Sequence, residues 1–216
     1  MSHSKTRRAE HGLFRRGRRG VAASEFALMV PIFFIIVLCT ADVMRLFRAQ
    51  LRMEMIAVQV GQVVSQCNPI TDPGDIDAFW ALAARIGGGL VDVNSATGGA
   101  MIISAVSLNT ATNRNRINWR RRTGNADIGS VLGPAAEGGE PILRGTNDAA
   151  FLLPAGQTLI VFEANAVVIP WVLSAGLIGT ALDRRIRGVT MFLTRIADPA
   201  RAQTPPVNSN ATDCTA

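Results

Sequence analysis

One apolar stretch, residues 20–41 (GVAASEFALMVPIFFIIVLCTA), constrains this chain more than any other part of its sequence. After Gly20 it holds a single charged residue, Glu25, and its length suits a helix that crosses the hydrocarbon core of a bilayer. The residues before it are strongly basic: Lys5, Arg7, Arg8, Arg15, Arg16, Arg18 and Arg19. Because basic flanks stay in the cytoplasm, we expect residues 1–20 to remain inside and everything after residue 41 to be exported.

The net charge of +6 belongs to this leader and not to the rest of the chain. Residues 1–20 contain seven Lys or Arg and one acid, so the remaining residues contain 22 − 7 = 15 basic and 16 − 1 = 15 acidic side chains. The excess of positive charge is therefore confined to residues 1–20, where it indicates which end of the membrane helix stays in the cytoplasm. It predicts no nucleic-acid partner, because such proteins concentrate basic residues on a surface.

The residue types that are missing exclude most catalytic chemistry. Both histidines and the only lysine lie in residues 1–20, and the chain has no tyrosine. A chain that starts at Val21 therefore lacks the side chains for Ser-His-Asp or Cys-His catalysis, Schiff-base formation, a histidine metal site or a P-loop. We predict that the protein is not an enzyme and needs no metal or cofactor. An exported hydrolase that uses carboxylates is the alternative, although no pair of acids stands out.

Glu25 is costly inside an apolar helix, and a charge in that position is a functional hypothesis by default. It follows a basic leader, Gly20 and four small or apolar residues, and it precedes the aromatic Phe26. This order resembles the processing site of type IV prepilins. The resemblance implies that a prepilin peptidase cuts between Gly20 and Val21, which makes Glu25 and Phe26 the fifth and sixth residues of the mature chain. An uncut signal anchor with an incidental glutamate is the alternative.

The opening RRGRRGVAASEFALMVPIFF also resembles that of TadE-like proteins, the minor pseudopilins of tight-adherence (Flp) pilus systems. The matching positions are Gly20, Ala22, Ala23, Glu25, Phe26, Ala27 and Pro31. A second similarity lies in residues 153–171 (LPAGQTLIVFEANAVVIPW), a strand that begins after Gly and ends in Pro and a large apolar residue. The tyrosines that relatives often carry in this strand are absent here.

This resemblance implies a role in pilus assembly and no catalytic role. It implies a minor pseudopilin of a Flp, type IVc-like system that helps to initiate pilus assembly from the bacterial inner membrane. The implied partners are a prepilin peptidase, other pilin or pseudopilin subunits and the inner-membrane assembly platform. The C-terminal domain is then periplasmic, and incorporation into an extracellular pilus is left open. The competing hypothesis is an uncleaved single-pass module that presents a periplasmic interaction or adhesion surface.

The membrane helix is predicted to continue beyond the bilayer. Residues 42–66 contain apolar residues at spacings of three and four, which indicates one apolar helical face. These residues are Leu46, Phe47, Leu51, Met55, Ile56, Val60, Val63 and Val64. We expect a single helix over residues 21–66, about 70 Å long, with a kink at Pro31 and an end before Pro69. The leader before it is predicted to be disordered until it is cut.

The fold class predicted is α+β: a long membrane-spanning helix followed by a small, largely antiparallel sheet. The domains are then a leader (1–20), a transmembrane helix (21–41), its amphipathic continuation (42–67) and a periplasmic domain (68–216). Within the last, we expect a short helix capped by Asp75 and ended by three glycines at 87–89. Strand patterns occupy residues 101–108, 115–123, 156–171 and 184–196, and residues 124–150 are predicted to form a long surface loop.

Cys67 and Cys214 are predicted to form a disulfide that ties the tail to the end of the long helix. Both lie on the exported side, where disulfides persist, whereas Cys39 lies in the membrane segment. Two free thiols are the alternative, because spacing alone does not settle the pairing.

Two surfaces are predicted to contact partners. Trp119 and Arg120 belong to the only basic patch after the leader, which the balanced charge identifies as a subunit contact or a solvated strand end. A polyanion site is the alternative. Ile169 and Trp171 form an apolar patch if residues 164–182 are a strand and a surface loop. The alternative for those uncharged residues is a second membrane span, which returns the C-terminus to the cytoplasm and forbids the disulfide.

Overall fold

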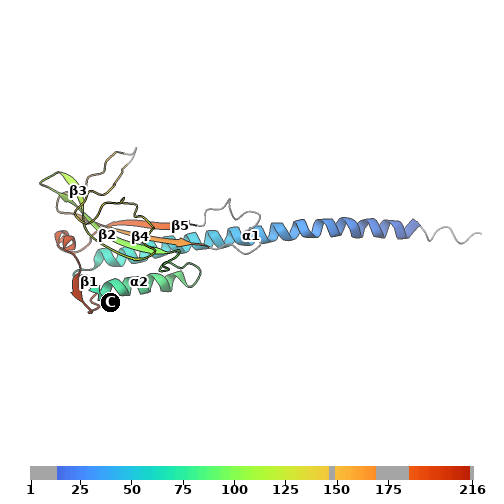
Figure 1. Ribbon diagram of the computed structural model, residues 1–216, viewed down its shortest axis with the longest axis horizontal. Coiled ribbons are helices and arrows are strands. Elements are labelled where there is room, and N and C mark those ends of the chain that lie inside the picture. Colours follow the sequence, from blue (N-terminus) through green and yellow to red (C-terminus); the bar gives the residue numbers. More distant parts are fainter. Residues whose placement is uncertain (1–13, 146–148, 169–184, 215–216) are drawn as a thin grey trace, which may run out of the picture.

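The computed structural model describes residues 14–145, 149–168 and 185–214. Its elements are α1 (Phe14–Gln66), β1 (Thr71–Pro73), α2 (Gly74–Gly87), β2 (Ala100–Asn109), β3 (Arg114–Gly124), β4 (Thr158–Val167), β5 (Arg185–Leu193), the 3-10 helix η2 (Pro199–Gln203) and β6 (Val207–Ser209). A long helix precedes an antiparallel sheet, so the predicted α+β class is confirmed (Figure 1).

Helix α1 is a rod whose N-terminal half projects far beyond the folded domain (Figure 1). It begins at Phe14, so the prediction that the whole leader is disordered is wrong for residues 14–20. Arginine is a good helix former, and a helix already nucleated downstream extends into such residues at little cost. The helix passes through Pro31 without interruption and ends at Gln66, as predicted. A kink at Pro31 stays a prediction.

The four-stranded sheet has the order β3-β2-β4-β5, and each neighbouring pair is antiparallel. The predicted hairpin is confirmed: Ala100 pairs with Gly124 and Asn109 with Arg114. The two central strands, β2 and β4, are buried along almost their whole length. Such strands read as continuous apolar runs because both of their faces are covered.

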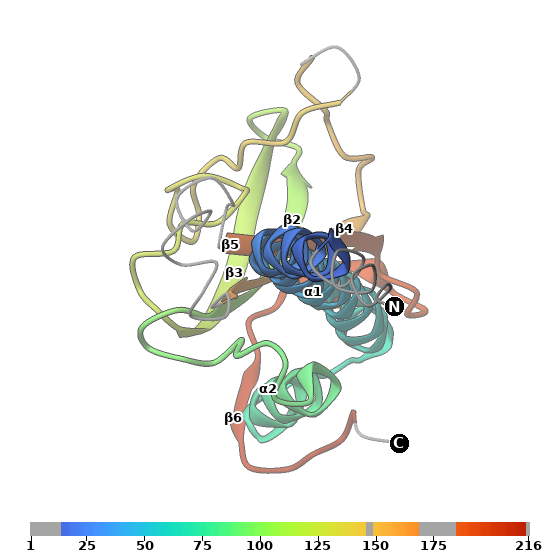
Figure 2. The same cartoon turned by 90° about the vertical axis from the view of Figure 1, so that its right-hand side faces the viewer.

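The two faces of the sheet are covered by different parts of the chain. Helices α1 and α2 lie on one face, as the view along α1 in Figure 2 shows. The core on that side consists mainly of Met53, Ile56, Ala57, Val60 and Val64 from α1, Phe79 and Trp80 from α2, and Met101, Ile103, Ile160 and Phe162 from the strands. The opposite face is covered by the connection between β3 and β4, which buries Leu132, Leu143 and Leu153. This connection is therefore more than the surface loop predicted.

Helix α1 and strand β5 approach each other closely. A Cβ atom built on Gly188 would lie 2.3 Å from the carbonyl oxygen of Met53, so no larger residue fits without displacing the helix. Nearby, the Thr190 hydroxyl donates a 2.7 Å hydrogen bond to the carbonyl of Ala57. The backbone N–H of Arg195 donates to the carbonyl of Ser65 at 3.0 Å. Backbone contacts as well as apolar packing therefore dock the rod on the sheet.

The apolar residues predicted to form one face of residues 42–66 are in fact divided between two faces. Ile56, Val60 and Val64 are buried against the sheet. Phe47, Leu51 and Met55 are 61%, 44% and 42% exposed. Spacings of three and four occur on every side of a helix, so a helix with two apolar sides matches the same pattern as a helix with one.

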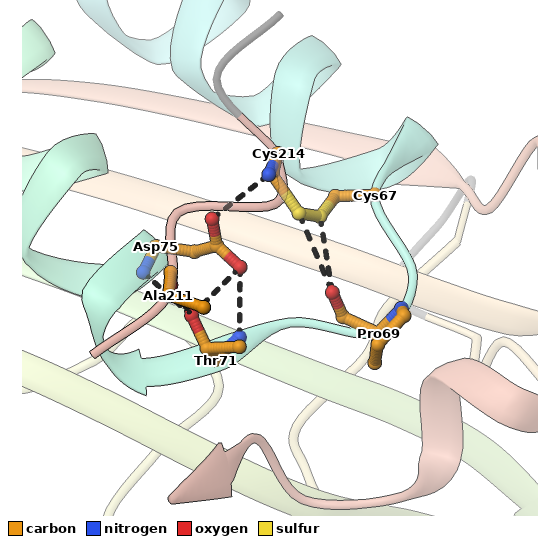
Figure 3. The surroundings of a disulfide bond; sticks show 6 residues. All are labelled: Cys67, Pro69, Thr71, Asp75, Ala211 and Cys214. Atoms are coloured by element: carbon orange, nitrogen blue, oxygen red, sulfur yellow. Dashed lines mark hydrogen bonds between the residues drawn. A yellow bond between two sulfur atoms is a disulfide. The ribbon is translucent and has the colours of Figure 1, made fainter. Parts of the chain in front are cut away.

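The C-terminal tail returns to the start of α2, where β6 pairs in parallel with β1. Asp75 is fully buried there and accepts hydrogen bonds from the backbone N–H groups of Thr71 and Cys214, both at 2.9 Å (Figure 3). The prediction that Asp75 caps α2 is wrong, because its carboxylate holds the tail. The Thr71 hydroxyl instead accepts the N–H of Asp75 at 2.9 Å.

The predicted disulfide between Cys67 and Cys214 is present in the structure (Figure 3). It joins the residue after α1 to the tail across a sequence separation of 147 residues. Cys39 is a free cysteine on the projecting part of α1. The disulfide and Asp75 therefore fasten the same tail at adjacent points.

A second membrane span over residues 164–182 is contradicted by the strands at its two ends. Residues 164–167 belong to β4, and Val167 lies directly opposite Arg185 of β5. A single crossing separates its two ends by a hydrocarbon core of about 30 Å, whereas these ends are paired neighbours. Strand β4 and the tail therefore lie on the same side of a membrane.

We expect Cys214→Ser to lower the free energy of unfolding by about 4–5 kcal/mol, because the disulfide closes a loop of more than 100 residues. Urea unfolding of the detergent-solubilised full chain, followed by tryptophan fluorescence, measures the change. Cys39→Ser is the matched control and leaves stability unchanged. Equal stability of the Cys214 variant and the wild type contradicts a stabilising role for the disulfide.

Candidate functional site

The projecting part of α1, residues 20–41, presents an unusual number of apolar side chains to the surroundings. The exposed ones are Val21, Phe26, Leu28, Met29, Ile32, Phe33, Phe34, Ile35, Ile36 and Val37. Within the part of the chain that the structure describes, α1 is the one helix long and apolar enough to cross a membrane. Water is a poor solvent for such a surface, so this segment is compatible with membrane anchoring.

The residues of the predicted cleavage and assembly site lie near the start of this segment. Gly20 is exposed, and a Cβ atom there would meet nothing within 4 Å. Val21 and Phe26 are 57% and 71% exposed. Glu25 is also exposed, and among the described residues no ion pair includes it. A carboxylate at membrane depth needs a partner, and the described part of this chain supplies none.

The predicted partner contact at Trp119 is wrong. The side chain is 1% exposed, and its indole N–H donates a 2.9 Å hydrogen bond to the carbonyl of Ala202. Alternating apolar residues in a strand mark its buried face, and here that face includes the tryptophan. The other proposed contacts on this surface, Ile169 and Trp171, lie outside the described residues.

The neighbouring arginines are occupied within the domain. Arg120 donates to the hydroxyl of Ser104 at 3.1 Å and to the carbonyl of Ala135 at 3.0 Å. Arg121 forms ion pairs with Asp72 at 2.5 Å and with Glu137 at 3.1 Å. These bonds anchor the β3–β4 connection and β1 to the sheet, which argues against a free polyanion-binding patch.

A buried charge on the sheet escaped sequence reasoning. Glu163 of β4 is fully buried on the face opposite the helices. Its carboxylate accepts hydrogen bonds from the Ser130 hydroxyl and from the N–H of Val131 at 2.8 Å. Burial raises the pKa of Glu163, while these two bonds and the positive charges of Arg187 and Arg120 oppose the rise. The one available sign in the sequence was a lone acid within the apolar run TLIVFEANAV.

Removal of this charge by Glu163→Gln is expected to change how stability depends on pH. The folded chain holds the Glu163 proton more tightly than the unfolded chain, because burial raises the pKa above its ordinary value of 4.5. The wild type should therefore gain stability relative to the variant as the pH falls from neutral toward 4.5. Urea unfolding at several pH values measures this difference.

The exposed Glu54 provides a control for this experiment. We expect Glu54→Gln to leave the dependence of stability on pH close to that of the wild type. A stability difference between wild type and Glu163→Gln that does not vary with pH contradicts the role assigned to burial.

The described residues offer little for catalysis. A cavity of about 280 Å³ is lined by Gly98, Asp127, Ile128, Gly129, Asn165, Ala166, Arg185, Ile186 and Arg187. Asp127 is the single carboxylate in this lining, whereas glycosidase-type hydrolysis needs two. One group of potential metal ligands, Cys67, Asp75 and Cys214, also occurs among the described residues. Its sulfurs form the disulfide, so the thiolates that a metal requires are not present.

Comparison with known proteins points to the same helix. Residues 20–62 match the family model described as TadE-like protein. No curated protein and no solved structure matches the chain. The matched segment includes the whole projecting part of α1 and most of its docked part. The match covers this one segment of the 216-residue chain and does not extend into the folded domain after residue 66. The resemblance seen in the sequence is therefore confirmed over residues 20–62, which lie within α1.

Proposed function

We propose that this chain is a minor pseudopilin of a tight-adherence (Flp, type IVc-like) pilus system that takes part in pilus assembly or initiation. The observation that carries the proposal is the TadE-like match on a helix that projects, with exposed apolar side chains, from a folded domain. Before assembly, α1 holds the protein in the bacterial inner membrane, with the N-terminus cytoplasmic and residues 68–216 periplasmic. Its partners are the prepilin peptidase, other pilin-like subunits and the assembly platform.

The proposed cleavage site lies within α1, between Gly20 and Val21. Glycine weakens a helix by about 1 kcal/mol relative to alanine, and two glycines, Gly17 and Gly20, lie in this part of α1. Local unwinding for a peptidase is therefore easier here than in the apolar residues that follow. Cleavage removes the basic leader and leaves an amine on Val21.

Processing predicts a mature chain that begins at Val21 only when a prepilin peptidase is co-expressed. Intact mass and N-terminal sequencing of the membrane-extracted protein measure this directly. Gly20→Leu should abolish the cut, because it replaces the glycine of the prepilin-like pattern directly before the proposed cleavage site with a large side chain. A full-length chain with and without the peptidase contradicts processing and favours an uncleaved membrane-anchored interaction or adhesion module.

The matched control for Gly20→Leu is Gly129→Leu. A Cβ atom on either glycine meets nothing within 4 Å, so neither change is expected to disturb the fold. Normal processing of the Gly129 variant shows that loss of cleavage at Gly20 reflects recognition by the peptidase and not misfolding.

The role of Glu25 in this proposal follows from the free-energy cost of placing a charged carboxylate inside the membrane. Its charge lies near the cytoplasmic end of the membrane segment and has no ion-pair partner among the described residues. The new amine on Val21 of a neighbouring subunit supplies the opposite charge at the same depth. An ion pair between subunits at that position sets the register of the packed helices.

We expect Glu25→Leu or Glu25→Ala to leave membrane insertion intact but to abolish co-purification with other pilin-like subunits. Co-purification in mild detergent from cells with the complete pilus system measures this effect. Asp77→Leu removes an exposed carboxylate of α2, outside α1, and serves as the control, with co-purification retained. Full co-purification of the Glu25 variants contradicts the proposed ion pair.

A further inference from the structure

The part of α1 that lies beyond the membrane segment carries a second exposed apolar surface. We call Met44, Phe47, Leu51, Met55 and Val58 the outer stripe. Their exposed fractions range from 42% to 61%. The outer stripe follows residues 20–41 in the chain, and its second half lies level with Met53 and Ala57, which dock α1 on the folded domain. Five large apolar side chains on one side of a helix indicate a missing contact.

The outer stripe follows the spacing of a helix–helix seam. Its members are separated by three, four, four and three residues, an average of 3.5, which is the repeat of packed parallel helices. The residues buried against the sheet, which include Ala49, Met53 and Val60, lie on the opposite side of α1. The outer stripe spans about 21 Å along the axis, so a partner helix of about four turns covers it.

Charge lies along one edge of the outer stripe. Arg45, Arg48 and Arg52 follow this edge, and none of them takes part in an ion pair within the described residues. Arg52 donates one hydrogen bond, to the carbonyl of Ile86 at 3.0 Å. The opposite edge has one acid, Glu54, which accepts from Gln50. An edge with three arginines favours a partner that brings carboxylates beside its own apolar residues.

We propose that the outer stripe binds a parallel helix from a different pilin-like subunit, one whose apolar seam is flanked by Asp or Glu on the side that meets Arg48 and Arg52. The proposal rests on the proposed function, since a neighbour anchored in the same membrane supplies a helix of the same direction. A second copy of this chain fits less well, because residues 42–66 of its α1 offer one exposed acid, Glu54, against three arginines. The contact then continues along α1 from the membrane into the periplasm.

The test is site-specific photo-crosslinking of the full chain in cells that express the complete pilus system. The probe is p-benzoylphenylalanine, placed in turn at three exposed phenylalanines: Phe47 in the outer stripe, Phe26 in the membrane segment and Phe151 on the β3–β4 connection. We expect a product from Phe47 that contains a different pilin-like subunit, as identified by mass spectrometry, and none from Phe151.

The other outcomes separate this inference from the proposed function. A product from Phe26 without one from Phe47 overturns the outer-stripe contact and leaves the proposed function standing. A Phe47 product that contains two copies of this chain overturns the choice of partner. No product from either position counts against both proposals.

A charge reversal tests the acidic edge of the partner. Changing both Arg48 and Arg52 to Glu should lower the yield of the Phe47 product by about tenfold, because like charges then meet across the seam. The matched control changes both to Lys, which keeps the charge and retains most of the yield. Cleavage at Gly20 and the Phe26 product should be unaffected by either pair of changes. An unchanged Phe47 yield in the Glu variant overturns the acidic partner.

Discussion

The close approach of α1 to β5 is the contact on which the rest of the structure depends. Gly188 brings the sheet against the carbonyl of Met53, and the Thr190 hydroxyl bonds to the carbonyl of the buried Ala57, about one turn further along the helix. A helix that rested on the sheet through flexible side chains alone would be free to slide. Here the backbones themselves meet, so the direction in which α1 leaves the domain is fixed.

The sequence predicts well those features that depend on neighbouring residues. Pro69 and Gly88 mark the ends of α1 and α2, and the hairpin of β2 and β3 follows from two apolar runs joined by a polar turn. The features that were missed depend on residues far apart in the chain. The carboxylate of Asp75 meets a residue 139 positions away, and that of Glu163 meets Ser130 across 33. No local pattern states which distant group satisfies a buried charge, and this is why Asp75 was assigned to a helix cap.

At the candidate site, too, local sequence patterns did not show which side chains are buried and which are exposed. Gly20 and Glu25 were selected as candidates because an acid in an apolar helix is rare, and the family match includes both positions. Trp119 was misassigned because an aromatic residue beside three arginines suits a binding surface and a buried strand equally well. The outer stripe was not separated from the core face of α1, since both faces contain apolar residues at helical spacing. The position of the sheet was needed to divide them.

The composition of helix α1 suits three environments: lipid, the sheet and the proposed partner helix. Apart from Glu25, residues 20–41 are apolar all round, which suits a helix in lipid. Beyond them, one side packs on the sheet while the opposite side keeps the outer stripe exposed. A helix that served as an anchor and a core element alone would carry polar residues on that outer side. Selection for solubility removes apolar residues that face water, so their presence along a 3.5-residue repeat is better explained by a neighbouring helix.

The disulfide and Asp75 hold the C-terminal tail against the end of α1 without help from the membrane. In the proposed function, the fold therefore stays intact while the anchor passes from lipid to a protein partner.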